Sequence, residues 1–560
     1  MMGKPLLSKM TLKEKIAQCL CVPQFDLNNR TEVDRNLLRT PEERDQLIAD
    51  NQYGVIWCHG GQRMQGVDLV ELKLEDIKVP SADYKEWVRN VEKNLKIPSL
   101  RAIDAERVGA GSVFEDLTYT CEPLNVGATD SEELAFALGA AVAKELKCAG
   151  LNWRWAPVVD IANRFAMNVM RGYSQDPDTV IRLANANIRG VQSEGVAATA
   201  KHFPGADRYE YRDAHFTQTM LFSDMKEWWR EQGKIFQGVI DGGVYSVMTS
   251  HIAFPAADDT KIKEKYIPAT LSKKIITNLL KEEMGFQGVV VTDGITMAGL
   301  SSFYEHDDLV VELMKAGNDV LLSCGIHDAD ILEKAVLDGR LSEERIDDAC
   351  QRVLDMKEKL GLFDEGYTLD TYTSEEVTSA TRALDIEIAR KSITLVRDLK
   401  QMLPIEAEKV KNVTVICSTH DETFFTALEN MKMEFETRGI HTRLHRRLES
   451  LEEMKEIAET SDLIIYAAYL APHQPKGAMA FFGEECQAFH HAFTYGEEKS
   501  IGISMGYPYI HYDIMGNADT FLNAYGSGTE CMKAVVEAIL GEIPIVGKSP
   551  VRLEPTHRIW

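Results

Sequence analysis

The chain has 560 residues, and its 62 Lys and Arg against 87 Asp and Glu leave a formal net charge of -25. That length exceeds what one hydrophobic core usually supports, which predicts two domains. The acidity argues against nucleic acid as a partner, because a phosphate backbone is bound by clustered Lys and Arg.

Membrane and metal partners are not indicated either. No stretch approaches the roughly 20 apolar residues that a bilayer crossing needs. The first residues, Met1 to Pro5, lead into a charged helical stretch rather than the apolar core of a signal peptide. The ten cysteines form no CxxC pair and no repeated Cys/His spacing. We therefore predict a cytoplasmic protein with reduced thiols, no membrane contact and no zinc site.

Short apolar runs alternate with helical stretches from about Gly54 to Gly325, which predicts βα units and a parallel sheet. The expected strands are Gly54–Trp57, Ser99–Ile103, Trp155–Val159, Ala197–Ala200, Tyr245–Thr249, Val289–Thr292 and Val320–Ser323. Most of these runs end in a polar residue: Asp104, Asp160, Lys201-His202, Ser250-His251, Asp293 and Cys324. Each alone is explained as a helix cap or a loop hydrogen-bonding group. Together they indicate the rim of a barrel active site, where the C-terminal strand ends meet.

A polar loop is expected after the strand that ends near Ala200. It runs from Lys201-His202-Phe203-Pro204-Gly205 to Asp213-Ala214-His215 and is placed to cover a substrate. Asp213 and His215 can meet if the loop turns at Ala214. A carboxylate beside an imidazole fixes its tautomer and raises its basicity, which suits a general acid/base. The alternative is a surface contact without a role.

The run Gly288-Val289-Val290-Val291-Thr292-Asp293-Gly294 delivers a carboxylate to the end of a buried strand. Its valines are apolar on both faces, as in a parallel sheet covered on both sides. Asp293 then occupies the position where barrel enzymes carry reactive groups. The alternative is an aspartate that caps the next helix.

The second half of the chain predicts a closing helix, a linker and a smaller domain. Helix Ser342–Leu360 carries apolar residues at helical spacing and is followed by Gly361. The linker and its connecting helix, Ala380–Lys391, occupy residues 364–400. Beyond it, strands Val413–Ile416, Leu463–Ala467 and Ile501–Ser504 alternate with helices Phe424–Arg438 and Ser527–Leu540. We predict a TIM-type (β/α)8 barrel over residues 1–363 and an α/β layered sandwich domain over 401–560.

Several of these segments resemble glycoside hydrolase family 3, in particular its β-N-acetylhexosaminidases. The loop Lys201–Gly205 with Asp213-Ala214-His215, and the strand Gly288–Leu300, resemble the family's KHFPG…D-x-H loop and its nucleophile strand. Further ordered likenesses are Met10–Lys15, Ala102–Asp104, Ala156–Asp160, Arg171–Pro177, Arg345–Asp347, Arg352–Leu354, Ser392–Val396 and Leu403-Pro404.

The resemblance implies a retaining double displacement without a metal or organic cofactor. Asp293 matches the nucleophile, and His215, oriented by Asp213, matches the acid/base. An imidazole carries no negative charge that would perturb a nearby carboxylate. Positions that hold sugar hydroxyls are matched by Asp104, Arg171, Lys201 and His202. Ser250-His251 also resembles a family segment, and there we expect a structural hydrogen-bonding role.

The chain departs from the family pattern at two places. The loop continues with Ala206-Asp207 where the family has His-Gly, and Ala214 stands inside the dyad. The Gly-Gly that usually follows the sugar-binding Asp-x-Glu turn is replaced by Arg107-Val108. These changes affect the wall around the sugar, and the extra Asp207, Arg208 and Glu210 suggest a different or charged glycoside.

Three hypotheses follow. The first is an exo-β-glycosidase that removes a terminal N-acetylhexosamine from a carbohydrate or glycoconjugate; another β-glycosidase of the family, such as a β-glucosidase, is its variant. The second is a glycoside phosphorylase, because a histidine acid/base leaves room for an anionic phosphate. The third is a sugar-binding protein without catalysis. The second domain either forms a wall of the site through Phe481-Phe482-Gly483-Glu484-Glu485, with Glu484 and Glu485 as rival acid/base groups, or mediates a homodimer.

Overall fold

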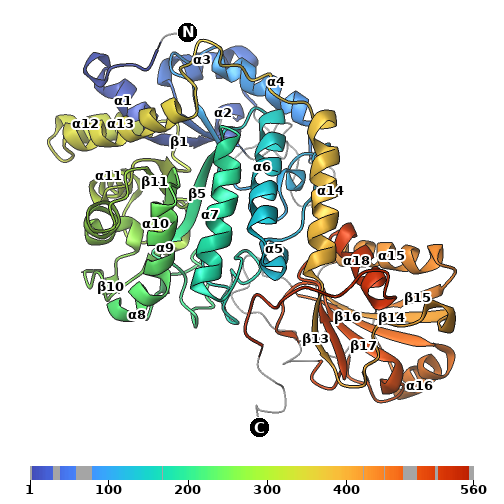
Figure 1. The fold of residues 1–560 in the computed structure, drawn as a ribbon. Coiled ribbons are helices and arrows are strands. Elements are labelled where there is room, and N and C mark those ends of the chain that lie inside the picture. Colours follow the sequence, from blue (N-terminus) through green and yellow to red (C-terminus); the bar gives the residue numbers. More distant parts are fainter. Residues whose placement is uncertain are drawn as a thin grey trace. The chain divides into compact units, whose positions relative to one another are not determined.

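The computed structural model describes residues 3–29, 38–58, 78–166, 168–419, 422–446, 448–470, 489–510 and 515–553. The chain forms two compact units, coloured along the sequence in Figure 1. The first comprises Met1–Tyr119, Ala135–Asp160 and Ala184–Thr381, and the second comprises Thr120–Leu134, Ile161–Leu183 and Arg382–Trp560. The predicted division into a barrel domain (1–363), a linker (364–400) and a second domain (401–560) stays a prediction.

The first unit is built on an eight-stranded parallel barrel. Its strands are β1 (Leu20–Pro23), β2 (Val55–Trp57), β3 (Leu100–Ile103), β4 (Trp153–Arg154), β5 (Ala197–Phe203), β7 (Ser246–Thr249), β11 (Val289–Thr292) and β12 (Leu321–Leu322). Each strand pairs in parallel with the next along the chain, and β12 pairs with β1. A parallel bridge between Val291 and Val320 joins the two remaining edges. The predicted barrel is therefore confirmed.

Two strand positions differ from the sequence-based expectation. Strand β4 ends at Arg154, and of the expected strand Trp155–Val159 only Val158 makes an isolated bridge, to Lys201. Pro157 lacks an amide donor and cannot continue a ladder. Strand β1 was not predicted, because its buried residues follow helix α1 (Leu12–Gln18) directly and an apolar run has no period that separates strand from helix.

Helices surround the strands of the first unit (Figure 1). After α1, the α-helices up to α13 that lie wholly or partly in this unit are α2 (Gln24–Asn28), α3 (Pro41–Asn51), α4 (Ser81–Glu92), α6 (Glu132–Cys148), α7 (Pro177–Ser193), α8 (Met225–Arg230), α9 (Gln232–Asp241), α10 (Ala298–Ser301), α11 (His306–Ala316), α12 (Asp328–Leu337) and α13 (Glu343–Lys359). Helix α5 (Pro123–Thr129) belongs to the second unit. The π-helix η6 (Lys274–Glu283) precedes β11, and short 3-10 turns are η1 (Leu7–Lys9), η4 (Ala110–Ser112) and η5 (Ala269–Leu271). Short strands outside the barrel are β6 (Thr219–Met220), β8 (Ile252–Ala253), β9 (Lys261–Ile262) and β10 (Lys265–Tyr266).

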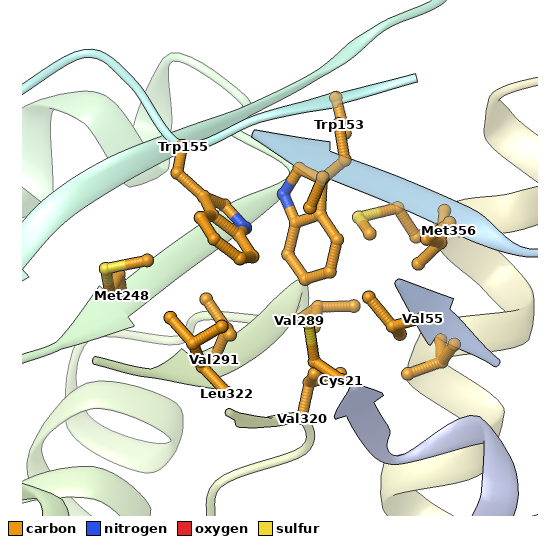
Figure 2. Packing of buried hydrophobic residues seen from close by; sticks show 14 of the residues in the cluster. Cys21, Val55, Trp153, Trp155, Met248, Val289, Val291, Val320, Leu322 and Met356 are labelled. Atoms are coloured by element: carbon orange, nitrogen blue, oxygen red, sulfur yellow. The ribbon is translucent and has the colours of Figure 1, made fainter. Parts of the chain in front are cut away.

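Side chains fill the barrel interior and form a packed floor beneath its C-terminal strand ends. Figure 2 shows Trp153 and Trp155 above Val289, Val291 and other strand residues. The two indole rings meet edge to face, with centroids 6.0 Å apart. Burying such side chains stabilises the fold by about 1.5–3 kcal/mol each for residues of Val to Phe size. Met356 of α13 extends this core (Figure 2).

The closing helix agrees with its sequence-based boundaries. Ser342 caps α13 by accepting a hydrogen bond from the amide of Arg345, and Gly361 follows with φ of 71°. The connecting helix is longer than expected, because α14 spans Ser374–Ser392.

The second unit contains a six-stranded sheet, as the predicted α/β layered domain requires. Its strands are β13 (Thr394–Asp398), β14 (Asn412–Thr419), β15 (His441–His445), β16 (Leu463–Tyr469), β17 (Ser500–Ser504) and β18 (Thr520–Asn523), in the order β13-β18-β17-β16-β14-β15. Only β13 is antiparallel to its neighbour in this sheet. Its helices include α15 (Glu422–Thr437), α16 (Leu451–Thr460) and α18 (Thr529–Ile539), with 3-10 turns η7 (Ala407–Lys409) and η8 (Glu497–Lys499). Among the described helices of either unit, none is long and apolar enough to cross a bilayer.

Candidate active site

The C-terminal ends of the barrel strands carry the predicted reactive groups. Asp104 directly follows β3, and Asp293 directly follows β11. Lys201 and His202 are among the last residues of β5. Because all of these strands are parallel, their ends open on one face of the barrel above the packed core.

Asp293 is held at a defined place and stays ionised. Its amide donates to the carbonyl of Thr249 over 2.9 Å, and the amide of Gly294 donates to its Oδ1 over 2.8 Å. Burial alone would raise the pKa of this carboxyl, but His251, His202, the Gly294 amide and Lys201 together lower it below the ordinary aspartate value. An ionised carboxylate at this position has the electronic state that a nucleophile needs.

His251 fixes the backbone that follows Asp293. The ring is buried, with Nδ1 3.0 Å from Thr270 Oγ1 and Nε2 2.9 Å from the carbonyl oxygen of Gly294. Burial lowers the pKa of this imidazole. In the neutral ring, Nε2–H donates to the carbonyl while Nδ1 accepts the threonine hydroxyl, a tautomer assigned from the hydrogen-bond network. The geometry agrees with the structural role expected for this segment.

The structure brings Asp213 and His215 together. Nδ1 of His215 lies 2.7 Å from Asp213 Oδ1, and the His215 amide donates to the same oxygen over 2.9 Å. Asp213 is buried, whereas the imidazole is partly exposed. A carboxylate at Nδ1 leaves Nε2 as the atom that can exchange a proton with a substrate.

The dyad loop is hydrogen-bonded to the segment that follows Asp293. The amide of Ala298 donates to the carbonyl of His215 over 3.2 Å, and the amide of Gly299 donates to the carbonyl of Ala214 over 3.0 Å. A Cβ on Gly299 would lie 2.7 Å from the Ala214 oxygen and 2.9 Å from that of Thr217. The approach of the two loops therefore requires glycine at this position.

Two ion-paired groups complete the rim in the first unit. Nζ of Lys201, whose side chain is only 2% exposed, lies 2.8 Å from Asp104 Oδ1 and 2.7 Å from Glu106 Oε2. Asp104 is half exposed and presents its carboxylate outward. His202 Nδ1 lies 2.8 Å from Asp160 Oδ2. Asp160 was expected at the strand-end rim without a specific partner, and Glu106 was not predicted as a site residue although it belongs to the Asp-x-Glu turn.

Two further predicted elements are not part of the described first unit. Arg171 belongs to the segment Ile161–Leu183 of the second unit, where its Nη1 donates to Asn168 Oδ1 over 2.6 Å. Its contact with a sugar hydroxyl stays a prediction. The segment Phe481–Glu485, with the rival carboxylates Glu484 and Glu485, lies outside the described residues.

The charged side chains of the dyad loop form hydrogen bonds and ion pairs that stabilise the loop. Asp207 accepts the amides of Tyr209 and Phe222, each over 2.8 Å. Glu210 is buried and accepts the amide of Met220 and the guanidinium of Arg212. Arg208 pairs with Glu231, the residue between α8 and α9. The carboxylates of Asp207 and Glu210 are therefore engaged within the protein, and the effect of the loop charges on the choice of glycoside stays a prediction.

The described residues contain no group of three or more His, Cys, Asp or Glu that could hold a metal ion. None of the nine cysteines in this part of the chain is joined in a disulfide.

A closed parallel barrel whose rim carries a carboxylate nucleophile candidate, a carboxylate–imidazole pair and a buried lysine defines an α/β-barrel enzyme. Residues 11–356 match the family model described as the glycosyl hydrolase family 3 N terminal domain, and the chain belongs to that family. The resemblance noted in the sequence is thereby confirmed, and the protein is a glycosidase.

Known proteins of this family resemble the chain along most of its length. A β-N-acetylglucosaminidase/β-glucosidase of Cellulomonas fimi is 27% identical over 502 residues, which cover 84% of this chain and 86% of the relative. β-Hexosaminidase A of Pseudoalteromonas piscicida is 30% identical over 331 residues, 55% of either chain. Among solved structures, the β-glucoside phosphorylase BglX has a TM-score of 0.81 at 26% identity, covering 98% of this chain and 94% of its own. A family 3 β-N-acetylglucosaminidase from Paenibacillus sp. str. FPU-7 has a TM-score of 0.79 at 25% identity, covering 98% and 100%.

Proposed function

We propose that the protein is a retaining exo-β-glycosidase that releases a terminal β-linked N-acetylhexosamine. The observation that carries this proposal is the pair of hydrogen bonds from Ala298 and Gly299 to His215 and Ala214, which ties the dyad loop to the chain just after Asp293. A nucleophile and an acid/base group must be held within one substrate's reach of each other, and this connection supports such an arrangement of Asp293 and His215.

In the proposed first step, the carboxylate of Asp293 attacks the anomeric carbon as the glycosidic C–O bond breaks. Nε2 of His215 gives its proton to the leaving oxygen, while Asp213 stabilises the imidazolium through Nδ1. In the second step, His215 takes a proton from water as the water oxygen attacks the anomeric carbon and frees Asp293. Two inversions return the β configuration, and the enzyme regains its starting charge state.

The sugar would be held by the charged groups at the rim. Lys201 is locked between Asp104 and Glu106, so the exposed carboxylate of Asp104 is available to hydroxyl groups at a fixed position. His202 is held by Asp160 and contributes to the lowered pKa of the Asp293 carboxyl, so it belongs to the same group of polar side chains. Ionic hydrogen bonds orient hydroxyl groups strongly. Arg171 is a further proposed contact.

The choice of N-acetylhexosamine rests on the names of the relatives, several of which are β-hexosaminidases or β-N-acetylglucosaminidases.

A second candidate is phosphorolysis, favoured by the similarity to a structure named as a β-glucoside phosphorylase. An imidazole acid/base admits an anionic phosphate that a carboxylate would repel. The sugar released then carries phosphate at its anomeric carbon instead of a hydroxyl group.

The test is a panel of nitrophenyl β-glycosides, namely N-acetylglucosaminide, N-acetylgalactosaminide, glucoside, galactoside, xyloside and glucuronide, each with and without phosphate. We expect hydrolysis of an N-acetylhexosaminide, a β-configured first product by NMR, and loss of turnover in Asp293→Asn. The matched control Asp355→Asn removes a carboxylate from the exposed face of α13 and should leave turnover unchanged. Acceleration by phosphate with a sugar 1-phosphate product would select the phosphorylase. Sugar binding without turnover would select the non-catalytic hypothesis.

We also propose that the protein acts in the cytoplasm without a cofactor and without nucleic acid or membrane as a partner. The location is supported by the reduced state of the described cysteines, none of which forms a disulfide. Cell fractionation tests it, and light scattering of the purified protein decides whether the homodimer forms.

A further inference from the structure

The loop that carries the dyad displays an unusual number of aromatic side chains. Tyr209, Tyr211, Phe216 and Phe222 are exposed by 54 to 67%. They are half of the eight aromatic side chains that are exposed in the described part of the chain, although they lie within fourteen residues. Exposed apolar groups concentrated beside a reactive centre indicate a contact surface for a ligand.

This loop is a built structure that holds its side chains in defined positions. Asp207 and Glu210 accept its backbone amides, and β6 pairs in parallel with β8 at its C-terminal end. At its beginning, Nε1 of Trp228 donates to the carbonyl of Pro204 over 2.8 Å. Phe216 is therefore presented by a loop fixed at both ends.

Phe216 differs from the other three aromatic residues in its relation to the dyad. Its ring centroid lies 6.4 Å from that of His215, with 42° between the planes, and its amide donates to the Asp213 carbonyl over 3.0 Å. Nδ1 of His215 is taken by Asp213, so a leaving group receives its proton from Nε2. The departing part of the substrate must lie against this imidazole, and a 58% exposed phenyl ring stands next to it.

We propose that Phe216 is the aglycone-binding residue of the site and that it stacks on the pyranose ring of a second sugar. The inference rests on the proposed function, because it assumes that His215 protonates the leaving oxygen. One face of a pyranose ring presents C–H groups, which pack on an aromatic ring as apolar surface does. The nearest basic residue of the loop, Arg212, is held by Glu210, so the surface suits a neutral sugar rather than an anionic aglycone.

The test compares two substrates that share their first sugar: the β-linked disaccharide chitobiose and the methyl β-glycoside of N-acetylglucosamine. In Phe216→Ala we expect kcat/KM for chitobiose to fall about 5- to 15-fold, the size of one lost aromatic contact, and kcat/KM for the methyl glycoside to change less than about twofold. Phe216→Tyr should retain the wild-type ratio between the two substrates. Phe136→Ala, which removes an exposed ring of α6 outside this loop, is the matched control and should change neither.

A second readout separates binding from positioning of His215. The glycosyl-enzyme is attacked either by water or by an added acceptor sugar, and both attacks use the same base. Phe216→Ala should lower the ratio of transfer product to hydrolysis product by a similar factor. If both substrates lose rate equally and the transfer ratio is unchanged, Phe216 acts only through His215 and the proposal is overturned. If the wild-type enzyme cleaves neither substrate, the proposed function itself has failed, and the aglycone site fails with it.

Discussion

The amide of Gly299 donates to the carbonyl of Ala214 over 3.0 Å, so the residue between the two members of the dyad is bonded to the helix that begins five residues after Asp293. Two chain segments that leave different strands of the barrel are thereby held in one arrangement. The separation between the proposed acid/base, His215, and the proposed nucleophile, Asp293, is then set mainly by backbone hydrogen bonds. Rotation of the two side chains changes it less.

Gly299→Ala should separate the two loops. The added methyl group would lie under 3 Å from two carbonyl oxygens, so the dyad loop must shift. A displacement of this size at a catalytic group reduces rate by about 10- to 100-fold. We expect kcat to fall by that factor while circular dichroism stays that of the wild type. Gly366→Ala, where an added Cβ meets nothing within 4 Å, is the matched control. An unchanged kcat in Gly299→Ala would contradict the role given to this contact.

His215→Ala should lose rate according to the leaving group. A general acid contributes about 10²–10⁴-fold, and most to the departure of basic alkoxides. The variant should therefore be strongly impaired on a disaccharide and much less on a dinitrophenyl glycoside, whose leaving group needs no proton. His327→Ala, which changes an exposed imidazole before α12, should behave as wild type on both. Equal losses on the two substrates would argue against an acid/base role for His215.

Lys201→Met should move the acidic limb of the pH–rate profile to higher pH. The pKa of the Asp293 carboxyl is raised by burial and lowered by His251, His202, Gly294 and Lys201, with a net lowering. Removal of the ammonium destabilises the carboxylate, so the pKa of Asp293 rises and the active ionised form is lost earlier as pH falls. The measurement is kcat/KM against pH, over the range in which circular dichroism shows an intact fold. Lys334→Met on the exposed face of α12 should leave the limb in place.

The sequence predicted the barrel and the site residues for the same physical reason. Val289 to Val291 are apolar on both faces and Asp293 breaks the run, so a buried strand with a polar end was readable from four residues. Strand β1 was missed because its four buried residues continue the apolar surface of α1, and only the pairing with β2 and β12 makes them a strand.

Contacts between segments that are distant in the sequence could not be predicted from the sequence alone. Nothing in the residues around Gly299 indicates that its missing side chain makes room for two carbonyl groups of another loop. Likewise, Asp207 and Glu210 looked like substrate-facing charges, and only the loop geometry shows that backbone amides occupy them. The sequence shows which charged groups are present and how they are spaced along the chain. The partners that these groups bind depend on which loops the fold brings together.

Asp385 should make the second unit more stable in acid than in base. Burial raises the pKa of its carboxyl to about 6, while Oδ1 accepts the amide of Cys121 over 2.5 Å. In the unfolded chain an aspartate titrates near 3.9, so the folded state holds a proton that the unfolded state has lost. The contribution of this group is complete below about pH 4 and is lost as pH rises through about 6.

Asp385→Asn keeps the acceptor oxygen without the charge. It should therefore raise the free energy of unfolding at pH 8 by up to about 2–3 kcal/mol and have little effect at pH 4. Urea unfolding at both pH values measures the difference, with the exposed Asp259→Asn as the control. If the variant and the wild type show the same change in stability between pH 4 and 8, the carboxyl of Asp385 is ionised in the folded protein, and burial does not set its charge.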